Sequence, residues 1–97
     1  MKVIYTEPAL EDLDAIRRYL AANYPALAVA VEKRMRAVVA RIARWLESAR
    51  RVEERPAVRV VPLIRYPYKV FYRITEEGVE IIHIHHAARE DVAGAAR

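Results

Sequence analysis

Two amphipathic stretches that meet at Asn23-Tyr24-Pro25 constrain the fold of this chain more than any other feature. In the first stretch, apolar residues recur at the spacing of one helix face: Ala9, Leu13, Ile16 and Leu20. Thr6 precedes this stretch as a candidate N-cap, and Pro8 suits the first helical turn. Proline cannot extend the hydrogen-bond ladder, so the first helix should end at Asn23-Tyr24-Pro25.

The second stretch carries a longer apolar stripe, with arginines mostly on the opposite side. Its apolar residues follow a three-four alternation: Ala28, Val31, Met35, Val38, Ile42 and Trp45. Trp45 closes the stripe, and we interpret it as an anchor of the core rather than as a partner contact. Because the connection between the two helices is short, they should lie antiparallel as a helical hairpin.

After Leu46 the patterning changes from helical to strand-like. Glu47 to Pro56 is a polar connection, and Val58 to Leu63 follows as a strand in which Pro62 favours an end or an edge. A short β-prone segment, Val3 to Tyr5, also precedes the first helix. These segments predict strands on both sides of the helical hairpin.

Tyr68 to Ile74 alternates as a strand with two distinct faces. One face holds Tyr68, Val70, Tyr72 and Ile74, and the other holds Lys69, Phe71 and Arg73. Thr75 to Gly78 is a turn in which the glycine relieves a left-handed position, and Val79 to His86 returns as the partner strand. We interpret Tyr68 and Tyr72 as core residues that pack against the helices.

The order is therefore β-α-α-β-β-β, an α+β domain in which a helical hairpin covers a small antiparallel sheet. The 97 residues suit one compact domain, so residues 1–97 are treated as a single unit. With 55% apolar and 31% charged residues, the chain has the composition of a soluble globular protein, not of a disordered one.

Its apolar runs are far shorter than the ~20 residues that span a bilayer, and its start lacks the apolar length of a signal peptide. We therefore expect a cytoplasmic protein with no membrane partner. The chain contains no cysteine, which excludes disulfides, thiolate metal sites and cysteine nucleophiles.

The positive charge is concentrated in the middle of the chain. The net charge is +4, and between Ala26 and Arg55 eight basic residues accompany only four acidic ones. The eight are Lys33, Arg34, Arg36, Arg41, Arg44, Arg50, Arg51 and Arg55. Such a stripe fits nucleic acid or an acidic protein partner, and it fits a solvated helix face equally well.

Three histidines close the last predicted strand. His83 and His85 share one strand face, while His86 falls on the other. Zinc accepts imidazole nitrogens, but an H-x-H pair is a weak signal and no third protein ligand is evident in the sequence. We therefore expect no metal and no other cofactor, and interpret these histidines as half-buried groups satisfied by a backbone or carboxylate partner.

In their order and spacing these features resemble the RelE/ParE superfamily of type II toxin-antitoxin systems, and its ParE branch (plasmid-stabilisation toxins) above all. The likeness runs from Val3 to Asp91, through VIYTEPALEDLDAIRRYLA, the long second helix and VRVVPLIRYPYKVFYRITEEGVEIIHIHHAARED. His86-Ala87-Ala88-Arg89 is similar to the family's closing signature, an arginine shortly after the last strand. The resemblance rests on order and spacing, since no single piece is a sharp motif.

This resemblance implies a growth-inhibiting toxin that a cognate antitoxin holds inactive. In the ParE branch the toxin binds DNA gyrase and traps its cleaved-DNA state, without a catalytic set of its own. We therefore expect a gyrase-binding toxin rather than an enzyme. A further possibility is a degenerate member that only binds its antitoxin and helps it repress their operon.

The RelE branch implies the alternative, an enzyme that cuts messenger RNA in the ribosomal A site. That chemistry must activate a 2′-hydroxyl, neutralise a phosphorane and protonate a leaving oxygen. The lysine pair of RelE-like enzymes falls at Val60 and Pro62, which cannot transfer a proton, and their C-terminal tyrosine has no counterpart. If the chain is a ribonuclease, the resemblance points to Lys69, Arg73, His86 and Arg89.

The resemblance also implies the form of the partner. The antitoxin should offer an acidic, disordered C-terminal segment that folds as a helix, and often a strand, along the hairpin and sheet edge to give a hetero-oligomer. The basic stripe would steer such a segment toward the toxin. The side chains that we expect to receive it are Arg34, Arg41, Arg44 and Arg59.

Overall fold

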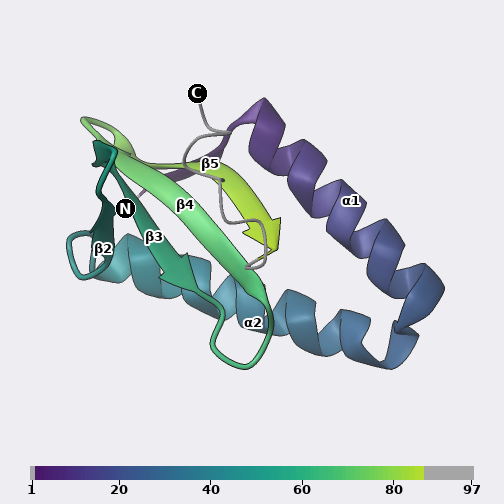
Figure 1. Ribbon diagram of the computed structural model, residues 1–97. Coiled ribbons are helices and arrows are strands. Elements are labelled where there is room, and N and C mark those ends of the chain that lie inside the picture. The colour runs from purple at the N-terminus through teal and green to yellow at the C-terminus, as the bar shows by residue number, and fades with distance from the viewer. Residues whose placement is uncertain (1, 87–97) are drawn as a thin grey trace.

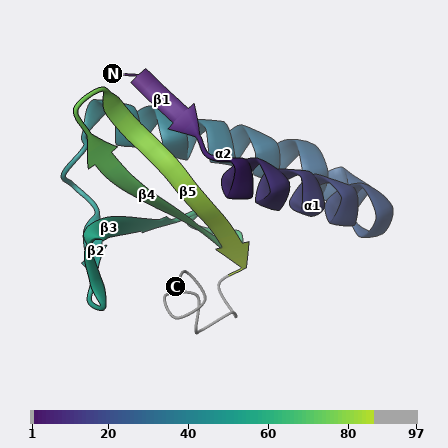
Figure 2. The same ribbon diagram turned by 90° about the horizontal axis from the view of Figure 1, so that it is seen from above.

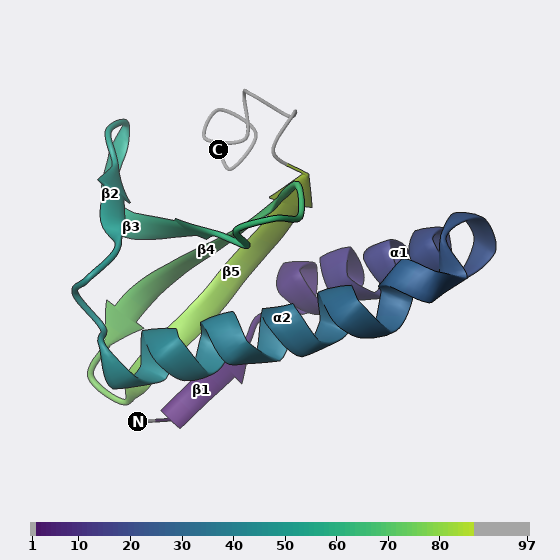
Figure 3. The ribbon, with the colours of Figure 1, turned by 90° about the horizontal axis from the view of Figure 1, so that it is seen from below.

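The computed structural model describes residues 2–86, which form two helices and a five-stranded sheet. The elements are β1 (Lys2–Tyr5), α1 (Glu7–Asn23), α2 (Pro25–Arg44), β2 (Arg50–Val52), β3 (Arg55–Pro62), β4 (Tyr68–Thr75) and β5 (Gly78–His86). The helices form an antiparallel hairpin on one side of the sheet (Figures 1 and 3), which confirms the predicted α+β architecture. Neither helix is long and apolar enough to cross a membrane.

The sheet runs in the order β1-β5-β4-β3-β2, and its last four strands form an antiparallel meander. β1 lies parallel to the first half of β5, with Lys2 opposite Gly78 and Tyr5 opposite Ile81 (Figure 2). The sheet is therefore mixed, which differs from the antiparallel sheet that we expect from the sequence. Residue alternation reveals that a segment is a strand, but not the direction of its neighbour.

The connection after α2 is more regular than its polar composition indicates. Arg50–Val52 forms β2, and β3 begins at Arg55 rather than at Val58. Arg50 and Arg51 pair with Val60 and Arg59 before the register shifts. The sequence does not predict these strand residues, because arginine and glutamate interrupt the apolar alternation on which strand prediction depends.

The face of the sheet toward the helices forms the main core. Its largest fully buried side chains are Tyr72, Leu63, Ile81, Val70 and Val79. They belong to one cluster with the buried residues of the helices, namely Ala9, Leu20, Val31, Met35, Val38, Val39 and Ile42. Tyr68 and Tyr72 are core residues, as predicted. The opposite face carries a smaller apolar cluster of Val52, Val58, Val60, Phe71 and Ile82.

Trp45 does not belong to this core. It caps the C-terminus of α2 with 57% of its surface exposed, and the Arg44 guanidinium lies 5.8 Å from the ring centroid. The prediction that Trp45 anchors the core is wrong, because the helix ends at Arg44. The backbone of Trp45 (φ −127°, ψ 68°) has already left the helical path that the apolar periodicity assumes.

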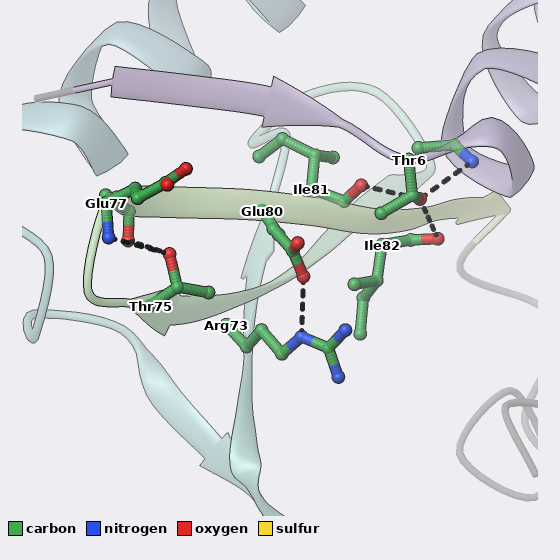
Figure 4. A network of polar contacts seen from close by, with 9 residues as sticks. Thr6, Arg73, Thr75, Glu77, Glu80, Ile81 and Ile82 are labelled. Carbon is green, nitrogen blue, oxygen red and sulfur yellow. Dashed lines mark hydrogen bonds and ion pairs between the residues drawn. The ribbon is translucent and has the colours of Figure 1, made fainter.

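Thr6 joins the start of α1 to β5. Its hydroxyl donates to the Ile81 carbonyl at 2.9 Å and accepts from the Ala9 N–H at 3.4 Å (Figure 4). The backbone N–H of Thr6 also donates to the Ile81 carbonyl, at 3.1 Å. This is the predicted N-cap, and Pro8 lies in the first turn as expected. The cap fixes the point at which the chain leaves the sheet and α1 begins.

Candidate partner-binding surface

A groove with a basic rim lies between α2 and the end of β3. It has a volume of about 390 Å³, and its lining includes the apolar residues Val38, Ile42, Val60 and Ile64. Four cations line it as well: Arg34, Arg41, Arg50 and Lys69. None of the described residues that line this basic groove is acidic.

The helical repeat and the strand register explain this gathering of charge. Arg34 and Arg41 are seven residues apart on α2, which is about two turns, so they project from the same side of the helix. Lys69 pairs in register with Pro62 at the end of β3, and Pro62 lines the same groove beside α2.

The charges of the basic groove are not neutralised within the described part of the chain. Arg17, Arg36 and Arg73 each have a carboxylate partner within 4.0 Å, but in residues 2–86 the four groove cations form no such ion pair. An acidic segment that enters the groove would therefore not have to displace an existing carboxylate of these residues.

The structure brings together only part of the predicted antitoxin-binding set. Arg34 and Arg41 lie in the basic groove, whereas Arg44 and Arg59 do not line it. The Arg59 guanidinium donates from Nη1 to the Glu47 carbonyl at 3.1 Å and to the Ala49 carbonyl at 2.9 Å. Arg59 therefore organises the connection between α2 and β2.

Two further grooves follow the helical hairpin. One, of about 530 Å³, lies between α1 and α2, and the Arg17–Glu32 ion pair of 3.2 Å connects residues of its lining. The other, of about 510 Å³, lies between the tip of the hairpin and the ends of β4 and β5. Figure 3 shows that this tip projects past the sheet. The lining of this second groove includes three large side chains that are at least 43% exposed: Tyr19, Tyr24 and Leu27. Such apolar surface favours a docked partner.

The residues of the ribonuclease alternative do not converge in the described part of the chain. Arg73 forms an ion pair of 2.8 Å with Glu80 near the turn between β4 and β5 (Figure 4), whereas Lys69 lies toward the other end of β4. His86 is opposite Tyr68 in register and makes an edge contact with that ring, so it falls on the other sheet face from Lys69. Arg89 lies outside the described residues.

The structure also shows a partner for the histidines that the sequence does not reveal. As predicted, His83 and His85 share one side of β5, and both approach the carboxylate of Asp12 in α1. The distances to Asp12 Oδ2 are 3.3 Å from His83 Nδ1 and 3.6 Å from His85 Nε2. No spacing signal links these residues, because 71 positions separate Asp12 from His83.

Residues 3–91 match the family model described as the ParE toxin of the type II toxin-antitoxin system, parDE. The chain belongs to the ParE toxin family. A solved structure, the chromosomal ParDE toxin-antitoxin system from P. aeruginosa, shares 26% sequence identity with it and superposes with a TM-score of 0.76. The match covers 89% of this chain and 95% of that one.

The isolated E. coli RelE toxin has the same fold as this ParE-family chain. Its crystal structure superposes with a TM-score of 0.63 at 17% identity, over 97% of this chain and 92% of that one. This likeness concerns the fold alone. No curated protein matches the chain at a significant level.

Proposed function

We propose that this ParE-family toxin inhibits growth by binding DNA gyrase, and that a cognate antitoxin neutralises it by occupying the basic groove. Membership of the ParE family supports the toxin role. The observation that carries the antitoxin part is the basic groove, an apolar lining combined with four cations that have no carboxylate partner in residues 2–86. The antitoxin then forms a hetero-oligomer with the toxin in the cytoplasm.

Action through protein binding fits the geometry better than RNA cleavage does. A ribonuclease needs an acid-base pair and a phosphate-binding cation around one reacting phosphate. Of the candidate residues, Arg73 is paired with Glu80 and His86 lies on the opposite sheet face from Lys69. This separation in the described chain offers no single position for a scissile phosphate.

An amphipathic acidic segment is the occupant that suits the basic groove. Its apolar side chains would cover the exposed Pro62 and the 65% exposed Ile64, which lie beside the buried Val38 and Ile42. Its carboxylates would meet Arg34, Arg41 and Lys69 at the rim, where complementary charge raises the rate of encounter. A disordered segment that folds on this surface also buries Pro62 and Ile64, which the free toxin leaves in contact with water.

The test is a supercoiling and cleavage assay with purified toxin, bacterial gyrase and plasmid DNA, with and without the antitoxin encoded beside the toxin. We expect linear DNA to accumulate with the toxin and to disappear when antitoxin is added. Ribosomes programmed with messenger RNA form a parallel arm, in which we expect no cleavage of the message.

Each result of these two assays separates the candidate functions. Undisturbed supercoiling at high toxin concentration together with cleaved messenger RNA would contradict the gyrase proposal and support the ribonuclease. Inactivity in both arms, with antitoxin still bound, would contradict a toxic function and support a member that serves only operon repression.

A further inference from the structure

Asp12, His83 and His85 form a cluster at the edge of the sheet, apart from the basic groove. β1 pairs with β5 only as far as Ile81, and the first turns of α1 lie beside the edge of β5 beyond that point (Figure 1). There Asp12 Oδ2 accepts a hydrogen bond of 2.9 Å from the Ile84 backbone N–H. The Asp12 carboxylate thus takes the role that a carbonyl of a neighbouring strand has elsewhere in the sheet. The two imidazoles that flank Ile84 in sequence reach the same oxygen.

The separations within this cluster are long for hydrogen bonds between an imidazole and a carboxylate. Charge-assisted N–H···O bonds are about 2.7–2.9 Å long. The two imidazole nitrogens lie 3.3 Å and 3.6 Å from the Asp12 oxygen, and the 3.6 Å separation is outside the usual hydrogen-bond range. Hydrogen bonding alone therefore gives a weak account of why three such groups meet here.

The same separations suit ligands arranged around a metal ion. In a tetrahedral zinc site with bonds of 2.0–2.1 Å, neighbouring ligand atoms are about 3.3 Å apart. Both nitrogen-oxygen separations are close to that value, and the three ligand atoms all lie within 4.8 Å of one another. The two nitrogens are therefore at most about 1.5 Å farther apart than in such a site.

We propose that Asp12, His83 and His85 bind a divalent transition-metal ion, with zinc as the first candidate. Imidazole and carboxylate together suit zinc and its neighbours, and three protein ligands leave a fourth position for water. His85 is 6% exposed and holds the inner side of the site, whereas the His83 and Asp12 side chains are each 26% exposed and give the ion a path from solvent.

The surroundings orient this ligand set. The Ile84 N–H that donates to Asp12 Oδ2 fixes the carboxylate against β5, as outer hydrogen bonds commonly do for metal ligands. The ring of His83 makes an edge contact with that of His85 at a centroid distance of 4.8 Å, and the His85 ring also contacts Phe71. A bound ion would join α1 to β5 across 71 residues of sequence, so metal binding should stabilise the fold.

The test measures zinc binding to the full chain without a histidine tag, by competition with a chromophoric chelator. Asp12→Asn keeps an acceptor for the Ile84 N–H but removes the anionic ligand, and His83→Gln and His85→Gln each remove one imidazole. Matched controls are Asp14→Asn, on the same helix, and His86→Gln, on the same strand. Cobalt substitution supplies a second readout, since the intensity of its visible bands distinguishes four-coordinate from six-coordinate sites.

We expect one zinc ion per chain in the wild type and in both controls, with a loss of affinity of at least about 100-fold in each of the three cluster variants. At a zinc concentration about 100 times the Kd, the melting temperature of the wild type should rise by on the order of 10 °C. Melting curves recorded without metal identify any variant that fails to fold. The zinc affinities of the cluster variants that do fold then show whether Asp12, His83 and His85 bind the ion.

Two results would overturn the proposal. One is a wild-type chain that takes no zinc from the chelator. The other is a set of folded cluster variants that bind zinc as the wild type does, which would place the ion on scattered surface groups. Neither result bears on the gyrase assay, because the metal site does not depend on the proposed function.

Discussion

Gly78 occupies a backbone position that other residues rarely adopt. It opens β5 with a φ of +146°, and a Cβ added there would stand 2.1 Å from the Lys2 carbonyl oxygen of β1. We expect Gly78→Ala to lower the free energy of unfolding by about 3 kcal/mol, because backbone strain adds to the displacement of β1. Denaturant unfolding followed by circular dichroism measures this loss.

The neighbouring turn residue Glu76 supplies the control for that variant. Its side chain is exposed, so Glu76→Ala should change the free energy of unfolding by less than about 0.5 kcal/mol. A Gly78→Ala variant as stable as this control would mean that β1 can move away from β5 at no cost. The close parallel pairing would then contribute little to the fold.

Tyr72 is a core residue whose ionisation should make the stability of the fold depend on pH. It is completely buried, its hydroxyl donates to the Leu46 carbonyl at 2.6 Å, and burial raises its pKa above 10.0 despite the opposing charge of Arg59. The folded state therefore holds this proton to a higher pH than the unfolded chain does. The resulting stabilisation is complete below pH 10 and is lost as the pH rises through the folded-state pKa.

We therefore expect the free energy of unfolding to decrease above pH 10, and to decrease less steeply in Tyr72→Phe. At neutral pH the same variant should lose about 1–2 kcal/mol, since the partly buried Leu46 carbonyl loses its donor. Urea unfolding at a series of pH values gives both quantities. Tyr24→Phe, at a 51% exposed position, is the control and should follow the wild-type pH profile. Parallel profiles for wild type and Tyr72→Phe would contradict this assignment.

At the scale of elements, the junction of α1 with β5 depends on a β-bulge. Phe71 pairs with His83 and Tyr72 with Ile81, so Ile82 is an extra residue in β5. The Thr6 hydroxyl donates to the Ile81 carbonyl and also lies 3.3 Å from the Ile82 carbonyl (Figure 4). One N-cap thus serves both the first turn of α1 and the irregular part of the strand.

Thr6→Ala should consequently cost about 2 kcal/mol of unfolding free energy, at the upper end of the range for N-cap removal. The reason is that the variant loses a helix cap and a hydrogen bond to β5 together. Thr6→Ser retains the hydroxyl and should remain within about 0.5 kcal/mol of the wild type. Equal destabilisation by alanine and serine, measured by thermal unfolding, would show that the methyl group rather than the hydroxyl is responsible.

The helices and the β4–β5 hairpin could be predicted from sequence because each follows from local periodicity. The bulge could not be predicted, since nothing in the alternation marks Ile82 as an extra residue. Regular alternation places His83 on the same face as the buried Ile81, but the bulge moves it to the opposite face, beside Asp12. The candidate metal site is therefore a product of tertiary structure, which a strand pattern alone does not reveal.

At the scale of the whole molecule, the cations of the predicted basic stripe make different kinds of contact. Arg36 pairs with Glu32 at 3.6 Å and Arg44 lies over Trp45, while Arg59 of β3, outside the stripe, binds main-chain carbonyls. Only Arg34, Arg41 and Arg50 of α2 and β2 join Lys69 in the basic groove. Composition predicts an excess of positive charge, but which cations remain available to a partner depends on how the helix and the sheet pack.

Charge reversal in the basic groove tests this division directly. Arg41→Glu should lower the association rate of the cognate antitoxin about tenfold at low salt, because it places a carboxylate where the acidic segment approaches. Lys33→Glu changes the net charge equally, but Lys33 is exposed on α2 and does not line the groove, so its association rate should fall much less.

Stopped-flow mixing at several salt concentrations separates steering from contact energy. The difference between Arg41→Glu and the wild type should shrink as salt rises, since a Debye length of ~10 Å at 0.1 M shortens to ~3 Å at 1 M. A difference that persists at high salt would assign Arg41 to a direct contact within the complex. Identical association rates for Arg41→Glu and Lys33→Glu would mean that the antitoxin responds to net charge, and that the basic groove is not its point of entry.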